Sequence, residues 1–308
     1  MDKNGFYAGL TIEESVLAWA DIVLSGVFHA AILFLVAAGL QLVFGVQKIL
    51  NLACGSFYAL GAYFGVSAVN AMLAAGIPVA YFLPVLIASG VLIGLTGLPV
   101  ERLLRTVYRR DESYQLLLTF GLLLMFQDVF RFIWGAAPRT MEKAYLAYGT
   151  VSGGGIQVPI YNLFVIAASI AIAGVLGLFL TRTNTGRIIR ATAENRDMAE
   201  GLGADTGKIY AYVFTLGCIL GTVGGALVVP ASAASLDMAV ELVVEAFAVV
   251  VIGGLGSMRG ALVGALITGL IRSLAISVFP EVEILAIYIV VIAVLVVRPG
   301  GLFGKAPA

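Results

Sequence analysis

Residues 49 to 100 form a run of 52 residues without one charged side chain. About 20 apolar residues are enough for one helix to cross a bilayer. The run is therefore long enough for two crossings, separated at Gly76-Ile77-Pro78, where glycine and proline interrupt a helix. This stretch alone predicts a membrane protein.

Composition shows that the rest of the chain is equally short of solvating groups. Charged residues make up 12% of the 308 residues and hydrophobic residues 61%, with a mean hydropathy of +1.04. A soluble domain carries about 25% charged residues, so lipid must be the solvent for most of this chain. The formal net charge is zero, so no basic field points to nucleic acid. Cys54 and Cys218 lack CxxC or Cys/His spacing, and we expect small buried residues and no metal site.

Uncharged stretches predict the remaining membrane segments. Five further spans are expected over 22–47, 113–134, 160–181, 210–230 and 260–279. Two segments are shorter. The run 246–258 predicts either a short tilted helix or a re-entrant segment, and 284–297 needs Glu281 and Glu283 at its edge to span. The expected fold class is all-α, a polytopic transmembrane helical bundle of about eight or nine membrane segments, some discontinuous or re-entrant. We expect one transmembrane domain over 1–308.

Lysine and arginine predict the orientation of such a bundle, because they are enriched in cytoplasmic loops. Nine crossings that start outside place thirteen of the 18 basic residues in inner loops and three in outer loops. The inner set is Lys48, Arg102, Arg105, Arg109, Arg110, Arg182, Arg187, Arg190, Arg196, Lys208, Arg259, Arg298 and Lys305. The outer set is Lys3, Arg139 and Lys143. We therefore expect the N-terminus outside and the C-terminus in the cytoplasm.

The inner loop 181–209 contains a two-faced helical pattern. Apolar and small side chains recur at spacings of three and four, which puts them on one helical face. This face consists of Ile188, Ala191, Asn195, Met198 and Leu202, and the opposite face of Arg190, Glu194, Arg196, Asp197 and Glu200. Gly201 and Gly203 are expected to end the helix. Because the polar face is mixed in sign rather than basic, the pattern favours a protein partner over a lipid surface.

Four stretches resemble the permeases of bacterial branched-chain amino acid ABC importers, LivH type. They are Arg190-Ala191-Thr192-Ala193-Glu194-Asn195 with Met198-Ala199 and Leu202-Gly203; Leu50-Asn51-Leu52-Ala53-Cys54-Gly55-Ser56-Phe57 with Gly61-Ala62-Tyr63; Glu245 to Ser257 with Gly260-Ala261; and Arg298-Pro299-Gly300-Gly301-Leu302-Phe303-Gly304. The first is similar to that family's ATPase-docking loop, the second to its second-span signature and the third to its late glycine-rich signature. The fourth is similar to its usual ending.

The resemblance implies a function and a set of partners. Members are inner-membrane permease subunits of ATP-binding-cassette importers, which move small polar solutes, with branched-chain or other amino acids the leading class here. Each pairs with a second, related permease, two cytoplasmic ATPase subunits and a periplasmic solute-binding protein. This chain has no GxxxxGK[ST] phosphate loop, so we expect no cofactor and no catalytic residue, with ATP bound by the partner subunits. The family usually carries histidine where this chain has Cys54, so no contact of that histidine is transferred.

Two sets of candidate site residues follow. The interrupted second span supplies a candidate translocation pathway, made of Asn51, Gly55, Ser56, Gly61 and Tyr63. Such residues at membrane depth are tolerated where a helix lines a cavity, although close helix packing explains the small ones too. The inner-loop helix supplies the candidate ATPase-docking residues, Ile188, Ala191, Glu194, Asn195, Met198 and Leu202. The outer loop 135–158 is either a plain surface loop or a docking surface for an extracytoplasmic partner.

Four ionisable residues lie within the spans, where a charge needs a partner. They are His29, Asp128, Arg131 and Arg272. We expect Asp128 and Arg131, three residues apart, to satisfy each other as a structural pair. Arg272 is expected to snorkel outward or to meet Glu241 or Glu245. His29 is expected to be a lone packing residue.

Other functions stay open at this stage. An ABC permease could carry urea, short amides or aromatic acids instead of amino acids. An ion-coupled secondary transporter would normally need ionisable couplers near the midplane, whereas the charges here lie near the span ends. An intramembrane enzyme would need a His/Glu/Asp cluster or a Ser/Lys pair, and a channel is disfavoured by the docking-like loop. Uptake that fails on ATP depletion while the proton gradient is maintained would separate the first two classes.

Overall fold

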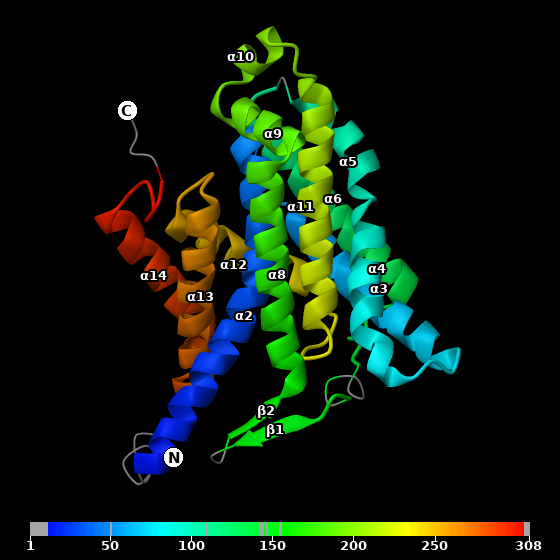
Figure 1. Cartoon of the computed structure of the whole chain (residues 1–308), viewed down its shortest axis with the longest axis vertical. Helices are drawn as coiled ribbons and strands as arrows, with labels where there is room; N and C mark the ends of the chain where they lie inside the picture. The colour runs from blue at the N-terminus through cyan, green and yellow to red at the C-terminus, as the bar shows by residue number, and fades with distance from the viewer. Residues whose placement is uncertain are drawn as a thin grey trace.

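The chain folds into a bundle of long helices, shown as a computed structural model in Figure 1. The structure describes residues 12–49, 51–108, 110–141, 145, 147–153 and 156–304. The longer helices are α2 (Ile12–Gln47), α3 (Cys54–Ala74), α6 (Glu112–Trp134), α8 (Ile160–Arg182), α11 (Thr206–Val228) and α13 (Met258–Val278). The shorter ones are α4 (Phe82–Gly94), α5 (Gly97–Leu104), α9 (Asn184–Glu194), α10 (Arg196–Gly201), α12 (Met238–Gly253) and α14 (Glu283–Val297). Three 3-10 turns join them, η1 (Val79–Tyr81), η2 (Arg105–Val107) and η3 (Pro280–Val282).

Eight helical segments in the described ranges are long and apolar enough to cross a membrane. They confirm the all-α class and the division of the run 49–100 into two spans, with Gly76 at a φ of 75° in the turn between them. Residues 246–253 of the segment predicted at 246–258 form the second half of α12, a helix of 16 residues. At 1.5 Å per residue α12 is about 24 Å long, and it is not among the eight candidate spans, which have 18 to 31 residues.

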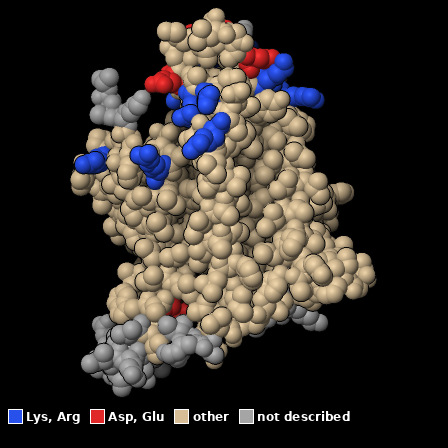
Figure 2. Space-filling model, viewed as in Figure 1, with Lys and Arg blue, Asp and Glu red and all other residues tan. Residues whose placement is uncertain are grey.

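The bundle has two distinct ends. One carries an antiparallel hairpin of β1 (Thr150–Gly153) and β2 (Ile156–Pro159), in which Val151 faces Val158; we call it the hairpin end. The other carries α9 and α10 (Figure 1). On the face in Figure 2, Lys and Arg gather near α9, α10 and the end of α14, and the middle of the bundle shows none. We call this second end the basic end. Such a distribution fits a hydrocarbon layer around the middle.

Helices α11 and α3 form the centre of the bundle. In the most apolar window of α11, 72% of residues are buried inside the protein, against 6% for α14. The two central helices approach closely because glycines face each other's backbone. A Cβ atom at Gly61 would collide with the Thr222 carbonyl, and one at Gly225 with the Tyr58 carbonyl. Without a hydrophobic drive between helices in lipid, such close contact supplies the packing energy.

The segment before α3 folds into the interior of the bundle. Cys54, the first residue of α3, lies beside Gly217 and Cys218 around a small void. Cys218 is twelve residues into α11, so α3 starts about 18 Å below the basic end of that helix. Ile49, Asn51 and Ala53 are all at most 5% exposed. These described residues of the linker are thus a buried, non-helical entry to α3.

Candidate functional site

The predicted pathway residues on α3 lie in packed surroundings. Asn51 Oδ1 accepts a hydrogen bond from the Ala53 backbone N–H at 3.0 Å, so its amide fixes the entry to the helix. A Cβ atom at Gly55 would collide with the Ala239 carbonyl of α12. Together with Gly61 against α11, these contacts favour a packing role for both glycines. The void beside Asn51 is only about 10 Å³, roughly the space of one water molecule.

Ser56 and Tyr63 differ from the glycines because their hydroxyls are unsatisfied. Both side chains are fully buried, and neither hydroxyl has a hydrogen-bond partner among the described residues. The Tyr63 ring packs against Phe130 and Trp134, with ring centroids 5.4 and 5.3 Å away. A buried hydroxyl without a partner is destabilising. Of the five predicted pathway residues, these two therefore keep a feature that packing alone does not explain.

Near the hairpin end, ionisable residues from four elements meet in one cluster. Glu245 of α12 binds Arg272 of α13 at 2.7 Å and His29 of α2 at 3.1 Å. Arg272 Nε contacts the Glu283 carboxylate at the start of α14, and Arg272 Nη1 also contacts His29. The predicted meeting of Arg272 with Glu245 is confirmed. The prediction of a lone packing role for His29 is wrong, because helix packing brings it against a carboxylate 216 residues away.

Asp128 and Arg131 do not form the expected pair. Both are exposed on α6, and no ion pair joins them within the part of the chain that the structure describes. An exposed i, i+3 pair gains little from holding two flexible side chains together. The ionisable residues of the spans that form ion pairs are therefore the ones that different helices bring together.

A cavity of about 270 Å³ opens beside the cluster. Its walls come from α2, α3, the 229–237 segment, α12 and α13. Its polar lining includes Tyr58, Ser232, Glu241, Glu245 and Arg272, and its apolar lining includes Phe28 and Met238. Apart from the rarity of intramembrane charge, no sequence pattern predicted this cavity.

At the basic end, the predicted amphipathic helix is two helices. Asn195 leaves the helical conformation at φ −150° and ψ 107°, and its Oδ1 accepts from the Met198 N–H at 3.0 Å. Asn195 therefore caps α10 instead of continuing α9. The single continuous helix predicted over 188–203 is wrong at this residue, since asparagine competes for nearby backbone donors. The predicted stop is confirmed: α10 ends at Gly201, and Gly203 has a φ of 89°.

The two short helices leave the predicted docking residues exposed. The buried side of the pair is Gly186, Ile189, Thr192 and Ala199. All six predicted docking residues are exposed, with Ile188 at 40%, Met198 at 68% and Leu202 at 87%. We call Ile188, Ala191, Met198 and Leu202 the apolar ridge. Next to it, a groove of about 980 Å³ lies between α9, the end of α2 and the segment after α14, and it is lined in part by Arg190 and Glu194.

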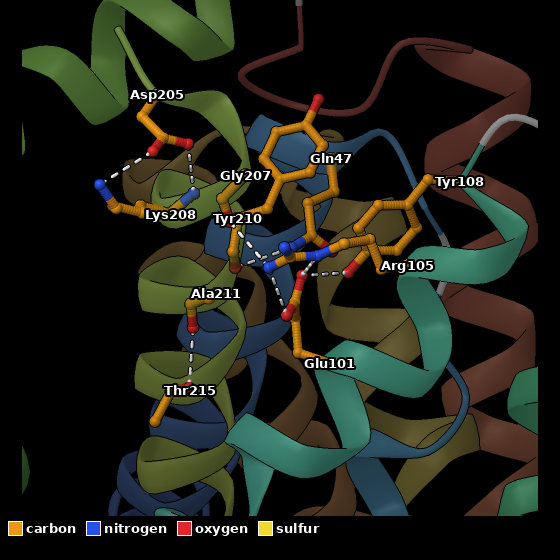
Figure 3. A network of polar contacts seen from close by, with 10 residues as sticks. All are labelled: Gln47, Glu101, Arg105, Tyr108, Asp205, Gly207, Lys208, Tyr210, Ala211 and Thr215. Atoms are coloured by element: carbon orange, nitrogen blue, oxygen red, sulfur yellow. Dashed lines mark hydrogen bonds and ion pairs between the residues drawn. The ribbon is translucent and has the colours of Figure 1, made fainter.

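A buried ionic contact holds the base of this region (Figure 3). Glu101 is fully buried on α5 and accepts two hydrogen bonds from Arg105, at 3.2 and 2.9 Å. Arg105 also donates to the Gly207 carbonyl at the start of α11, at 3.1 Å. The Tyr108 hydroxyl donates to Glu101 at 3.3 Å, and burial raises the pKa of that phenol, so it stays protonated. These hydrogen bonds hold the start of α11 against α5 and η2.

Capping and stacking position the rest of the loop. Asp205 caps α11 by accepting from the Lys208 N–H at 3.1 Å, and the Lys208 side chain lowers the pKa of this carboxyl. Arg196 of α10 stacks over the Tyr210 ring of α11, 5.4 Å from its centroid. Gln47 donates to the Tyr210 carbonyl at 3.0 Å, which joins the end of α2 to the same turn. The apolar ridge is therefore held on a rigid base.

These features define a polytopic membrane protein with a solute-sized polar cavity at one end and an exposed apolar ridge at the other. The family described as "Branched-chain amino acid transport system / permease component" matches residues 22–297. The chain belongs to this family, and it is a transport permease component.

Individual relatives are similar over nearly the full length. The high-affinity branched-chain amino acid transport system permease protein BraD of Pseudomonas aeruginosa is 25% identical over 280 residues, covering 88% of this chain and 91% of that protein. The corresponding protein LivH of Escherichia coli is 25% identical over 305 residues, covering 96% and 98%. The ribose import permease protein RbsC of Haemophilus influenzae is 26% identical over 261 residues, covering 82% and 76%.

Proposed function

We propose that this chain is the permease subunit of an ATP-driven importer in a bacterial inner membrane, and that it moves branched-chain or other amino acids. Membership of the permease family supports the transport role. The names of BraD and LivH support the solute class. The name of RbsC is the reason to keep other polar solutes as the alternative, among them urea, short amides and aromatic acids.

The proposed assembly pairs this chain with a second, related permease as a heterodimer. Two ATPase subunits bind and hydrolyse ATP at the basic end, which we place in the cytoplasm. A periplasmic binding protein delivers solute to the hairpin end, which we place outside, with the N-terminus. The gathering of Lys and Arg around α9 and α10 supports this orientation.

The observation that carries the proposal is the apolar ridge on α9 and α10. Ile188, Met198 and Leu202 are exposed beside charged residues, beyond the apolar middle of the bundle. An amphipathic helix of this kind binds by laying its apolar side into a groove on a partner. Glu194 and Asn195 lie at the rim of the ridge, where they would fix its register on the ATPase.

A charge placed on the ridge tests this docking. Met198→Asp and Ala191→Asp would put a desolvated carboxylate in the partner's groove, which costs several kcal/mol. Both variants should insert and pair with the second permease, but co-purify with less ATPase and transport less. Thr106→Asp adds the same charge at an exposed position of η2, outside α9 and α10, and should behave as wild type. Normal ATPase recovery and transport by both ridge variants would refute the docking role.

Orientation is tested by labelling single cysteines with an impermeant reagent in spheroplasts. A cysteine at Val151 in the hairpin should react, and one at Glu194 should react only after permeabilisation. The native Cys218 is buried and Cys54 half-buried, so both give a low background. Labelling at residue 194 in intact spheroplasts would reverse the proposed orientation.

The proposed pathway along α3 is tested at the residues that packing does not explain. Asn51, Gly55, Ser56, Gly61 and Tyr63 stay the candidate lining, and bulky substitution of Gly55 should now disturb the α3–α12 contact as well as uptake. Ser56→Ala removes a hydroxyl that bonds to no described residue, so it should leave assembly intact and lower uptake. Unchanged uptake by Ser56→Ala would remove this residue from the pathway.

A further inference from the structure

Two polar groups in the walls of the hairpin-end cavity have no partner among the residues that the structure describes. The Tyr58 side chain is 6% exposed, and its hydroxyl makes no hydrogen bond with any residue that the structure describes. Glu241 forms no ion pair within the same described ranges. Buried hydroxyls are almost always hydrogen-bonded to protein, water or ligand. The cavity therefore offers an oxygen acceptor and a carboxylate to an occupant.

The charges around the cavity do not cancel. Arg272 is held between Glu245 and Glu283, so its positive charge is already offset by two carboxylates. Glu241 then adds a negative charge to the same walls. Glu241 is exposed, so an incoming cation can reach its carboxylate. A cavity wall with excess negative charge attracts a cation. A solute that bound Arg272 through a carboxylate would have to displace one of the carboxylates that hold Arg272.

The remaining lining limits the size and character of the occupant. Phe28, Met238 and Leu242 give the cavity apolar walls. A volume of about 270 Å³ lies just below the range of roughly 300 to 1,000 Å³ typical of ligand pockets. The cavity therefore fits a small solute with one positive group and a short apolar body.

We propose that this cavity is a solute-binding site that recognises an ammonium group, with Glu241 as its ion partner and the Tyr58 hydroxyl oxygen as a second acceptor. The Glu245–Arg272 pair closes the wall behind the ammonium group and keeps anionic solutes out. This inference rests on the proposed function and narrows its solute class. Ammonium-bearing solutes such as amino acids are admitted, whereas neutral amides and simple acids are not.

The test measures binding to the purified, assembled transporter with three probes of one carbon skeleton. They are leucine, its decarboxylated amine 3-methylbutylamine, and its deaminated acid 4-methylpentanoate. Radiolabelled amine should bind, leucine should compete for it and the acid should not. Glu241→Gln should weaken amine binding at least tenfold, Glu241→Asp should restore part of it, and Tyr58→Phe should weaken it less than Glu241→Gln. Asp128→Asn removes an exposed carboxylate on α6, outside the cavity, and should bind as wild type.

Failure of this inference is distinguishable from failure of the proposed function. No binding of the amine to the wild type, unchanged binding by Glu241→Gln, or competition by the acid equal to that of leucine would each overturn the site. Leucine uptake together with any of those results would leave the proposed function standing. Glu241-dependent binding of the amine without leucine uptake would support the site and refute the amino-acid solute.

Discussion

The buried carboxylate at the basic end allows a quantitative prediction. Glu101 and Arg105 form an i, i+4 pair on α5 and η2, in which Glu101 is 0% and Arg105 49% exposed. Arg196 and Glu200 form an i, i+4 pair of the same residue types on α10, but both side chains are more than 40% exposed. The two pairs differ in the burial of the acid and in its bonds, since Glu101 makes a two-point bond to Arg105 and accepts from Tyr108, whereas Glu200 accepts from Arg196 Nε and from Thr206. A glutamine at each acid therefore compares a buried two-point pair with an exposed pair.

Glu101→Gln should destabilise the protein by about 2 kcal/mol. The amide keeps one acceptor but loses the two-point bond to Arg105, and a hydrogen bond to a charged group contributes about 1.5–3 kcal/mol. The full 3–5 kcal/mol expected for a stranded buried charge does not apply, because Arg105 reaches solvent. Glu200→Gln should cost less than about 1 kcal/mol, as exposed pairs do.

Thermal unfolding of the purified protein in detergent measures both effects. The midpoint of Glu101→Gln should fall well below that of wild type, and that of Glu200→Gln should stay close to it. Proteolysis between α10 and α11 should also quicken in Glu101→Gln, since Arg105 no longer holds the Gly207 carbonyl as firmly. Equal shifts for the two variants would refute the reasoning that burial sets the strength of this contact.

Three further predictions follow from the packing and the loop. Gly225→Val should prevent α3 and α11 from packing and abolish recovery of folded protein, whereas Gly177→Val on α8, where a Cβ atom meets nothing within 4 Å, should be recovered as wild type. Because the Lys208 side chain holds the pKa of Asp205 below its ordinary value of 3.8, the ionised carboxyl stabilises the fold above that pH, and this stability is lost as pH falls through the lower, folded value. Asp205→Asn should therefore flatten the acid side of a plot of unfolding midpoint against pH, and an unchanged slope would contradict the stabilising contact with Lys208. Arg272→Met should remove the arginine partner of both Glu245 and Glu283 and lower the unfolding midpoint more than Arg131→Met, because Arg131 is exposed and makes no ion pair with a described residue.

The comparison of sequence and structure separates two kinds of information. The charge-free run 49–100 was enough to predict α3 and the α4–α5 span, because insertion depends on a sum of transfer free energies along about 20 residues. The concentration of Lys and Arg in particular loops could likewise be counted before any fold was known. Periodicity placed Ile188, Ala191, Met198 and Leu202 on one side of the α9–α10 pair, and all four are exposed. Periodicity did not predict the break at Asn195, because the spacing of apolar residues does not show that a side chain will cap the backbone that follows it.

Only the tertiary structure decided which distant residues meet. His29, Glu245 and Arg272 lie on three helices and form one ionic cluster, whereas the sequence left open whether Arg272 snorkels outward or meets Glu241 or Glu245. From the sequence alone, Gly61 and Gly225 could have faced lipid, a partner or a neighbouring helix. The way α3 and α11 are rotated against each other turns Gly61 toward α11 and Gly225 toward α3. The physical reason is that residence in the membrane follows from local composition, whereas contacts between spans depend on the rotation and register of whole helices. The sequence by itself therefore determined a membrane permease of this family, and helix packing alone placed Tyr58 and Glu241 in the walls of one cavity.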